Sequence, residues 1–158
     1  LTGGPLPKDS PFFAQVRAAG GVIVLDASEG GEMMLPATLN DRRGMDDPLG
    51  ELARAYLNSP SIHQRPNTRF HDRLREQIAL RSASGLILRR YVWCDLWHAE
   101  ARRLVETAVV PVLDLEVDSD SPAEQARNAT RIGGVIEMLQ ATARCSAHQP
   151  HPAQRGAG

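Results

Sequence analysis

The residues best able to do chemistry lie together in one short segment that contains Trp93, Cys94, Asp95 and His98. The segment follows an apolar run and precedes a helical pattern, so the cysteine falls where a strand gives way to a helix. In an open α/β sheet the carboxyl ends of the strands face the ligand crevice, and a thiol just past a strand points toward it. A helix N-terminus also stabilises a thiolate, which is both a nucleophile and a metal ligand. The chemistry predicted for this segment therefore depends on Cys94.

The neighbours of Cys94 leave several interpretations open. The negative charge of Asp95 disfavours a thiolate beside it, whereas His98, one helical turn further on, could act as the base of a Cys–His thiol hydrolase if it turned toward the sulfur. Zinc takes about four ligands and an iron–sulfur cluster three or four thiolates, but the chain has only two cysteines, Cys94 and Cys145. A buried, unreactive cysteine is about as well supported by the residues alone.

A second candidate is the loop with Ser28, Glu29 and Glu32 around the pair Gly30-Gly31. Two glycines after a parallel strand allow a backbone to approach a ligand, and carboxylates can be positioned around it. The glycine pair completes no dinucleotide fingerprint, and the chain has no phosphate-binding Gly-Lys-Ser/Thr sequence. Solvated carboxylates are therefore the simpler interpretation, with a substrate loop as the alternative.

Three β-branched and apolar runs predict strands buried on both faces of a parallel sheet. They are residues 21–26, 85–88 and 109–115. The opening residues 1–4 resemble the end of a further strand running into a turn, so most of the first strand is expected to lie ahead of Leu1.

Helical spacing of apolar residues, together with capping signals, predicts the helices between these strands. They are expected from Ser10 to Gly20, over 48–57, after Asn67, over 97–108 and from Ser121 to about residue 143, with an irregular excursion over 33–46. In the second of them one buried stripe is predicted, made of Leu49, Leu52, Ala53, Tyr56 and Leu57.

Alternating strands and helices predict an α/β fold with a three-layer parallel sheet, flavodoxin-like or Rossmann-like, that lacks its first strand. Residues 1–145 are expected to form this domain. Residues 146–158, rich in Pro, His, Gln and Gly, are expected to form a disordered tail.

The amino-acid composition bears on which partners the protein binds and in which cellular compartment it is expected. The 158 residues are 42% hydrophobic and carry a formal charge of -1, without the basic excess of a nucleic-acid binder. No stretch is apolar over the roughly 20 residues that a membrane span needs. Two cysteines are too few for a disulfide scaffold, so a soluble protein of the reducing cytoplasm is predicted.

Taken together, several segments resemble the carboxy-terminal domain of the 2-hydroxyacyl-CoA dehydratase and benzoyl-CoA reductase subunit family. The resemblance covers residues 1–139. It is carried by Gly85-Leu86-Ile87-Leu88, by Tyr91-Val92-Trp93-Cys94-Asp95-Leu96-Trp97-His98-Ala99-Glu100, by Val110-Pro111-Val112-Leu113-Asp114-Leu115-Glu116 and by the helix with Gln125, Arg127, Arg131 and Glu137. Asp26-Ala27-Ser28-Glu29-Gly30-Gly31-Glu32 is similar to the family's acidic loop.

The resemblance implies that Cys94 is one thiolate ligand of a [4Fe-4S] cluster, with the other cysteine ligands on an amino-terminal domain. It also implies a related subunit as partner, in a homodimer or heterodimer, and a separate ATP-dependent activator protein that supplies a low-potential electron. The substrate would be a CoA thioester, which undergoes radical dehydration or reduction. Residues expected in a second shell or a substrate loop are Trp93, Asp95, His98, Ser28, Glu29 and Glu32. The alternatives kept open are a non-catalytic binding or assembly module of the same fold and, as a minor one, the Cys–His thiol hydrolase.

Overall fold

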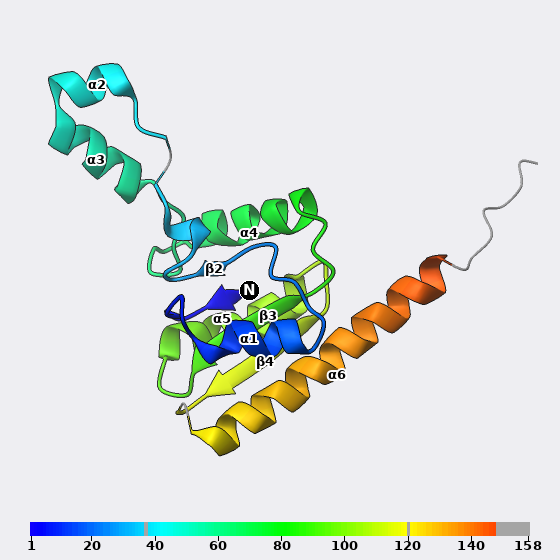
Figure 1. Cartoon of the computed structure of the whole chain (residues 1–158). Coiled ribbons are helices and arrows are strands. Elements are labelled where there is room, and N and C mark those ends of the chain that lie inside the picture. Colours follow the sequence, from blue (N-terminus) through cyan, green and yellow to red (C-terminus); the bar gives the residue numbers. More distant parts are fainter. Residues whose placement is uncertain (37, 120, 148–158) are drawn as a thin grey trace, which may run out of the picture.

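Four parallel strands form one sheet, with helices on both of its faces (Figure 1). The computed structural model describes residues 1–36, 38–119 and 121–147. The strands are β1 (Thr2–Gly3), β2 (Ala27–Ser28), β3 (Leu86–Tyr91) and β4 (Val112–Val117), in the spatial order β2-β1-β3-β4. The helices are α1 (Pro11–Ala18), α2 (Asp41–Asp46), α3 (Pro48–Leu57), α4 (Thr68–Leu80), α5 (Asp95–Thr107) and α6 (Pro122–Ala147), with a 3-10 turn η1 (Glu32–Met34). This confirms the predicted three-layer α/β fold, and the strand order is that of flavodoxin-like sheets.

The two faces of the sheet bury two separate hydrophobic cores. On one face, α4 and α5 contribute Phe70, Leu74, Trp97 and Leu104, which pack over Leu88 of β3. On the other face, apolar residues of α1 and α6 pack over β4. Their central side chains are Phe12, Val16, Ile132, Ile136 and Leu115. Helices α1, α4, α5 and α6 therefore each bury apolar side chains at helical spacing against the sheet.

Strand β1 is present as two residues in the middle of the sheet, paired with both β2 and β3. The predicted strand over 21–26 is wrong in position, because β2 is Ala27–Ser28. Thr2 pairs with Ala27, so residues 22–24 lie opposite positions ahead of Leu1, and no described strand pairs with them. Val22 is accordingly 82% exposed instead of being covered on both faces.

Helices α2 and α3 form an arm that projects from the α/β layers (Figure 1). The prediction of an irregular segment over 33–46 is corrected by α2, whose N-cap Asn40 accepts a hydrogen bond from the Arg43 N–H at 3.0 Å. The predicted buried stripe of α3 is wrong: Leu49, Leu52, Ala53, Tyr56 and Leu57 are exposed, and the buried residues are Glu51 and Ala55. The helical period was right, but most of the predicted apolar stripe is exposed in the described part of the chain.

Helix α6 begins as predicted, with Ser121 Oγ accepting a hydrogen bond from the Glu124 N–H at 3.3 Å. It continues to Ala147, so the first two residues of the expected tail, 146 and 147, belong to a helix. The rest of that tail, 148–158, lies outside the described residues. None of the described helices is long and apolar enough to cross a bilayer.

Candidate functional site

The carboxyl ends of β2 and β3 bring the predicted site residues other than Glu32 to one edge of the sheet. In the order β2-β1-β3-β4 the topological switch point, where open α/β sheets bind ligands, lies between β1 and β3. Gly3 ends β1 with φ +129°, and a Cβ there would lie 1.8 Å from the Arg89 carbonyl oxygen of β3. Only glycine permits this approach, which closes β1 onto β3 and turns the chain away from the edge.

Cys94 lies at this edge as the N-cap residue of α5. Its N–H donates to the Tyr91 carbonyl at 3.1 Å, and its own carbonyl accepts from the His98 N–H at 3.0 Å. The side chain is half-buried and packs against the core under α4 and α5. The thiol is thus fixed at a helix N-terminus without being sealed inside the core.

Asp95 and His98 do not form a catalytic pair with the thiol. Asp95 is exposed in the first turn of α5. Every ring-nitrogen contact of His98 in the described part of the chain goes to Arg90, to the Val92 carbonyl at 2.9 Å or to Glu116 at 3.4 Å, and none goes to Cys94. The imidazole therefore faces the β4 side, where it is not placed to deprotonate the sulfur.

The histidine belongs to a charged cluster that joins β3 to β4. Arg90 donates two hydrogen bonds to Asp114, at 2.8 and 3.0 Å, and one to Glu116 at 3.0 Å. These hydrogen bonds, above all those to Asp114, raise the pKa of the buried Arg90 guanidinium above its ordinary value. A bidentate pair of this kind fixes both strands at the end of the sheet that carries Cys94.

The two tryptophans of the segment have opposite roles. Trp97 is 1% exposed, and its indole N–H donates to Glu29 Oε1 at 2.7 Å. Trp93 is 64% exposed and stacks on Tyr91, with ring centroids 5.2 Å apart. Trp97 therefore packs in the core, whereas Trp93 leaves an aromatic face open beside Cys94.

The end of β2 contributes Ser28, and the loop that follows contributes Glu29, to the same edge. Glu29 is held by Trp97 and lies 3.7 Å from His63 Nε2, so it is a positioned carboxylate and not a freely solvated one. Ser28 is 2% exposed, and its Oγ has no hydrogen-bond partner among the described residues. Both residues therefore reach the site through β2, next to α5.

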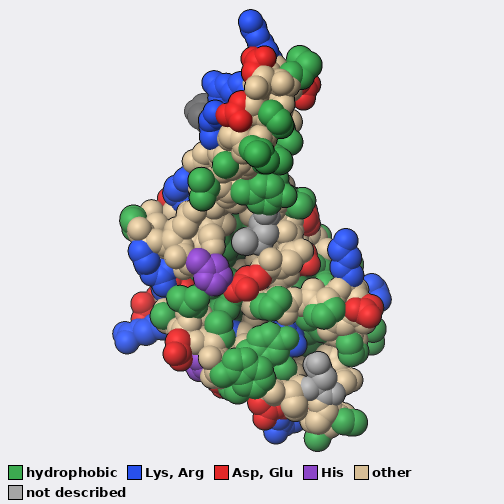
Figure 2. All heavy atoms as spheres, turned by 90° about the vertical axis from the view of Figure 1, so that its left-hand side faces the viewer, with side chains coloured by type: hydrophobic (Ala, Val, Ile, Leu, Met, Phe, Trp, Pro, Cys, Tyr) green, Lys and Arg blue, Asp and Glu red, His purple; other side chains and the backbone are tan. Residues whose placement is uncertain are grey.

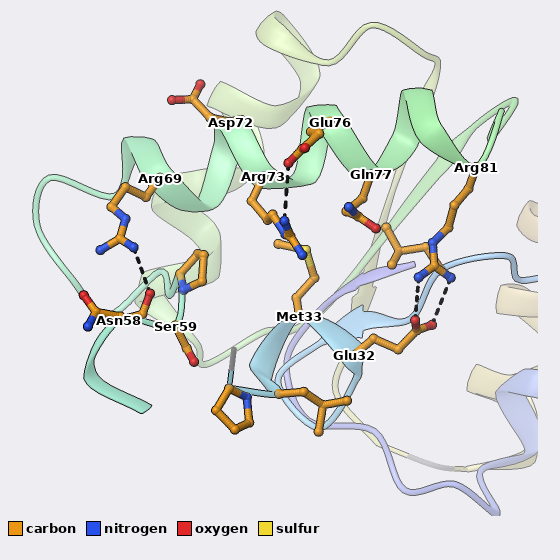
Figure 3. A pocket seen from close by; sticks show the side chains of 14 residues that line it. Glu32, Met33, Asn58, Ser59, Arg69, Asp72, Arg73, Glu76, Gln77 and Arg81 are labelled. Atoms are coloured by element: carbon orange, nitrogen blue, oxygen red, sulfur yellow. Dashed lines mark hydrogen bonds and ion pairs between the residues drawn. The ribbon is translucent and has the colours of Figure 1, made fainter. Parts of the chain in front are cut away.

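Glu32 lies elsewhere. It pairs with Arg81, the C-cap residue of α4, at 2.6 Å and lines a cavity of about 820 Å³ between η1, residues 58–60 and α4 (Figure 3). Figure 3 shows that the arginines of this cavity are engaged locally, Arg73 with Glu76 and Arg69 with the Asn58 carbonyl. Cys94 is not among the lining residues. The structure thus separates Glu32 from the residues around the thiol.

A buried polar cluster behind α5 was missed by sequence reasoning. Glu100 accepts from Asn67 Nδ2 at 2.6 Å and lies 2.7 Å from His71 Nε2, while Arg103 donates to Asn67 Oδ1 at 2.7 Å. Asn67, expected to cap α4, makes no side-chain cap bond and joins this cluster instead. Burial is the main cause that lowers the pKa of His71. The signal in the sequence is Glu100 on the face of α5 that also carries Trp97, since a carboxylate on a buried face requires partners.

The described residues contain no group of three or more His, Cys, Asp or Glu side chains that could hold a metal ion. Cys145 is exposed near the end of α6. Within the described part of the chain, a cluster could therefore receive one suitably placed thiolate, that of Cys94, from this domain.

Comparison with known proteins adds a family to this geometry. The family model described as 2-hydroxyglutaryl-CoA dehydratase, D-component, matches residues 1–139. None of the curated proteins matches the chain. The matched residues contain all four strands, the loop with Ser28 and Glu29, and Cys94, whereas Cys145 lies beyond them.

Proposed function

Because the chain belongs to the 2-hydroxyglutaryl-CoA dehydratase D-component family, we propose that it is the cluster-binding α/β domain of a 2-hydroxyacyl-CoA dehydratase or benzoyl-CoA reductase type subunit. The observation that carries the proposal is the position of Cys94. A half-buried thiol at a helix N-terminus, beside the switch point between β1 and β3, lies where sheets of this topology bind their ligands. The alternative of an inert, fully packed cysteine has less support, because the side chain is only partly covered.

The chain can supply one ligand of a [4Fe-4S] cluster, the thiolate of Cys94. A cluster of this type requires three or four thiolates, so Cys94 would be joined by cysteines on polypeptide outside the chain. When bound, the cluster would supply one-electron reduction of the carbonyl of a CoA thioester at low potential. The electron would come from an ATP-dependent activator protein. This supports radical dehydration or reduction of an acyl-CoA as the reaction.

The chain's own residues hold the sulfur and shape its surroundings. The Trp97–Glu29 hydrogen bond ties the first turns of α5 to the loop after β2, and the Glu100–His71 contact ties α5 to α4. The exposed face of Trp93 would exclude water from the sulfur when covered by the rest of the protein. We leave Glu32 out of this site and assign Asp95 and His98 to its outer surroundings.

A partner subunit is implied by the word component in the family description, and we assign its contact to the arm of α2 and α3. A short helix is marginal in isolation and gains stability by packing an apolar face, yet the large apolar residues of α3 are exposed. In Figure 2 the arm, at the top, carries hydrophobic side chains among charged ones. A related subunit that covers Leu49, Leu52 and Tyr56 would supply this packing. We place the complex in the cytoplasm, where thiolate ligands remain reduced.

The test is an anaerobic analysis of iron and sulfide in the complete polypeptide, purified with its partner. Cys94→Ser should reduce bound iron and sulfide severalfold and abolish dehydration of the acyl-CoA. Cys145→Ser is the matched control and should leave both unchanged. Equal cluster content in Cys94→Ser and the parent would refute the ligand role and favour a non-catalytic assembly module.

A further inference from the structure

The cavity beside Glu32 has one face of α4 as a wall (Figure 3). Its volume, about 820 Å³, lies in the range of about 300–1,000 Å³ that is typical of small-molecule sites. Four polar side chains line it at four-residue spacing along α4 and its C-cap: Arg69, Arg73, Gln77 and Arg81. Residues four apart lie on the same face of a helix, roughly 6 Å from one another along its axis. The wall is therefore a row of hydrogen-bonding groups.

Gln77 is the member of this row whose side chain has no partner among the described residues. It is only 8% exposed, and in Figure 3 its side chain points from α4 into the cavity. A carboxamide has one carbonyl acceptor and two N–H donors. Buried groups of this kind are normally hydrogen-bonded, so Gln77 is placed to bind a group that enters the cavity.

The end of the row next to Gln77 is electrically neutral. Arg81 forms two hydrogen bonds with Glu32, at 2.6 and 3.3 Å, so its charge is compensated. Leu25 and Met33 are buried and line the same cavity. A group that binds at this end is therefore expected to be uncharged, with an apolar surface and a polar edge that faces Gln77.

The end of the row toward the start of α4 is positively charged. Arg69 donates to a backbone carbonyl at 2.9 Å and pairs with no carboxylate in the described part of the chain. Arg73 has one contact with Glu76 at 3.4 Å, and ion pairs between side chains as exposed as these are weak. Asp72 also lines the cavity, but it pairs with Arg75 at 3.0 Å and points away in Figure 3. This end therefore favours an anion.

We propose that the cavity binds an adenine nucleotide, with the adenine ring at the Gln77 end and a phosphate group between Arg73 and Arg69. Adenine presents a donor and an acceptor side by side, which a glutamine carboxamide matches with two hydrogen bonds. Guanine presents two acceptors there and is preferred by arginine, but Arg81 is engaged by Glu32. Guanidinium groups match phosphate oxygens in charge and geometry. The groups along α4 thus follow the order of groups along a nucleotide.

Two kinds of molecule carry this group, a free adenine nucleotide and a CoA thioester, and the second rests on the function proposed above. Arg69, at the phosphate end, contacts residue 58, and the same connection carries His63. His63 lies 3.7 Å from Glu29, the hydrogen-bond partner of Trp97. A CoA thioester bound here would therefore direct its thioester arm from the phosphate end toward the edge of the sheet that carries Cys94.

Isothermal titration calorimetry of the complete polypeptide with its partner, without the activator, tests the site with AMP, GMP and adenosine. AMP should bind about tenfold or more tightly than either of the others. Gln77→Met, which keeps the side-chain length but removes the amide, should abolish the preference for AMP over GMP. Arg69→Gln with Arg73→Gln should abolish the preference for AMP over adenosine. Arg75→Gln, in α4 but outside the cavity, is the matched control and should retain both preferences.

Titration with CoA identifies the source of the nucleotide. Affinity at least tenfold higher than that of AMP, lost in Arg69→Gln with Arg73→Gln, would support CoA, and a smaller advantage would support a free nucleotide. The proposal is overturned if neither AMP nor CoA binds at millimolar concentration, or if both bind the parent and the cavity variants equally.

The Tm of each variant reports whether it is folded. Arg73→Gln alone, at an exposed side chain, still decides the question if Gln77→Met does not fold. Bound iron and sulfide should be equal in all of these variants. A failure of the nucleotide site is therefore distinguishable from a failure of the ligand role of Cys94.

Discussion

Trp97 Nε1 donates a hydrogen bond to Glu29 Oε1 at 2.7 Å across 68 positions of sequence. The bond joins the first turns of α5, where Cys94 is the N-cap, to the loop that follows β2. An indole N–H that is buried requires an acceptor, and a half-buried carboxylate requires a donor, so each residue satisfies the other. This contact is what links the two segments that the sequence singled out for chemistry.

A double-mutant cycle on Trp97→Phe and Glu29→Gln should give a coupling free energy of about 1–2 kcal/mol, because one hydrogen bond to a charged group is shared by the two residues. Urea unfolding of the four proteins measures it. Trp93→Phe is the matched control: its ring is exposed, so it should change the free energy of unfolding by less than about 1 kcal/mol. Strictly additive effects of Trp97→Phe and Glu29→Gln would contradict the assignment.

Gly3→Ala should be among the most destabilising substitutions in the chain, at about 3 kcal/mol or more, because the added Cβ meets the Arg89 carbonyl at 1.8 Å and φ is +129°. Gly133→Ala in α6 is the contrast. A Cβ there meets nothing within 4 Å, so helix propensity alone should raise the free energy of unfolding by about 0.5–1 kcal/mol. Thermal unfolding of both variants tests the pair, and a well-tolerated Gly3→Ala would show that β1 does not close on β3 as described.

Stability should fall as the pH decreases below about 6.5, in part through His71. Burial lowers its pKa in the folded state from the ordinary value of 6.5, so the unfolded chain binds the proton more readily. The stabilisation is complete above pH 6.5 and is lost as the pH falls through the lowered pKa, with a slope of at most about 1.4 kcal/mol per pH unit. His71→Gln keeps a donor for Glu100 but does not titrate. Urea unfolding between pH 5 and 8 should therefore show a smaller slope for this variant, and an unchanged slope would refute the role of His71.

Leu49→Ser with Leu52→Ser should weaken association with the partner subunit by about tenfold or more, since buried leucines at an interface each contribute more than about 1 kcal/mol. The melting temperature of the isolated chain should hardly change, because both side chains are exposed there. Leu80→Ser is the matched control, an exposed leucine on α4 outside the arm. Sedimentation of the mixed subunits measures the affinity. Equal affinities for the arm and control variants would exclude the arm as the contact.

The layered fold was predictable because α1, α4, α5 and α6 bury apolar residues at helical spacing and because β3 and β4 contain continuous apolar runs, although their bounds, Leu86–Tyr91 and Val112–Val117, differ from the predicted 85–88 and 109–115. The strand over 21–26 was misplaced, since pairing in a sheet depends on which neighbour is present, and residues 22–24 lie opposite positions ahead of Leu1. Helix α3 likewise has a helical period, but the face that it covers carries Glu51 and Ala55 and its large apolar residues are exposed. The spacing of apolar residues in the sequence shows that one face of a helix is apolar, but it does not show what packs on that face.

The candidate site was predictable in part. Cys94 and Glu29 were identified because a lone thiol and an acidic loop both follow strands of a parallel sheet. The Trp97–Glu29 bond and the Glu100–His71–Asn67 cluster were not, because they join residues 29 to 68 positions apart. Spacing left open whether His98 turns toward the thiol, but its ring contacts Arg90 and Glu116 on adjacent strands instead.

The most direct test of the central claim is alkylation of Cys94 in the complete protein, with and without its cluster. Iodoacetamide labelling followed by mass spectrometry reports both cysteines of this chain at once, so the exposed Cys145 serves as an internal control. If Cys94 is a cluster ligand, it should be labelled in the cluster-free protein and protected about tenfold or more when the cluster is bound, with Cys145 labelled equally in both. Equal labelling of Cys94 in the two forms would contradict the account.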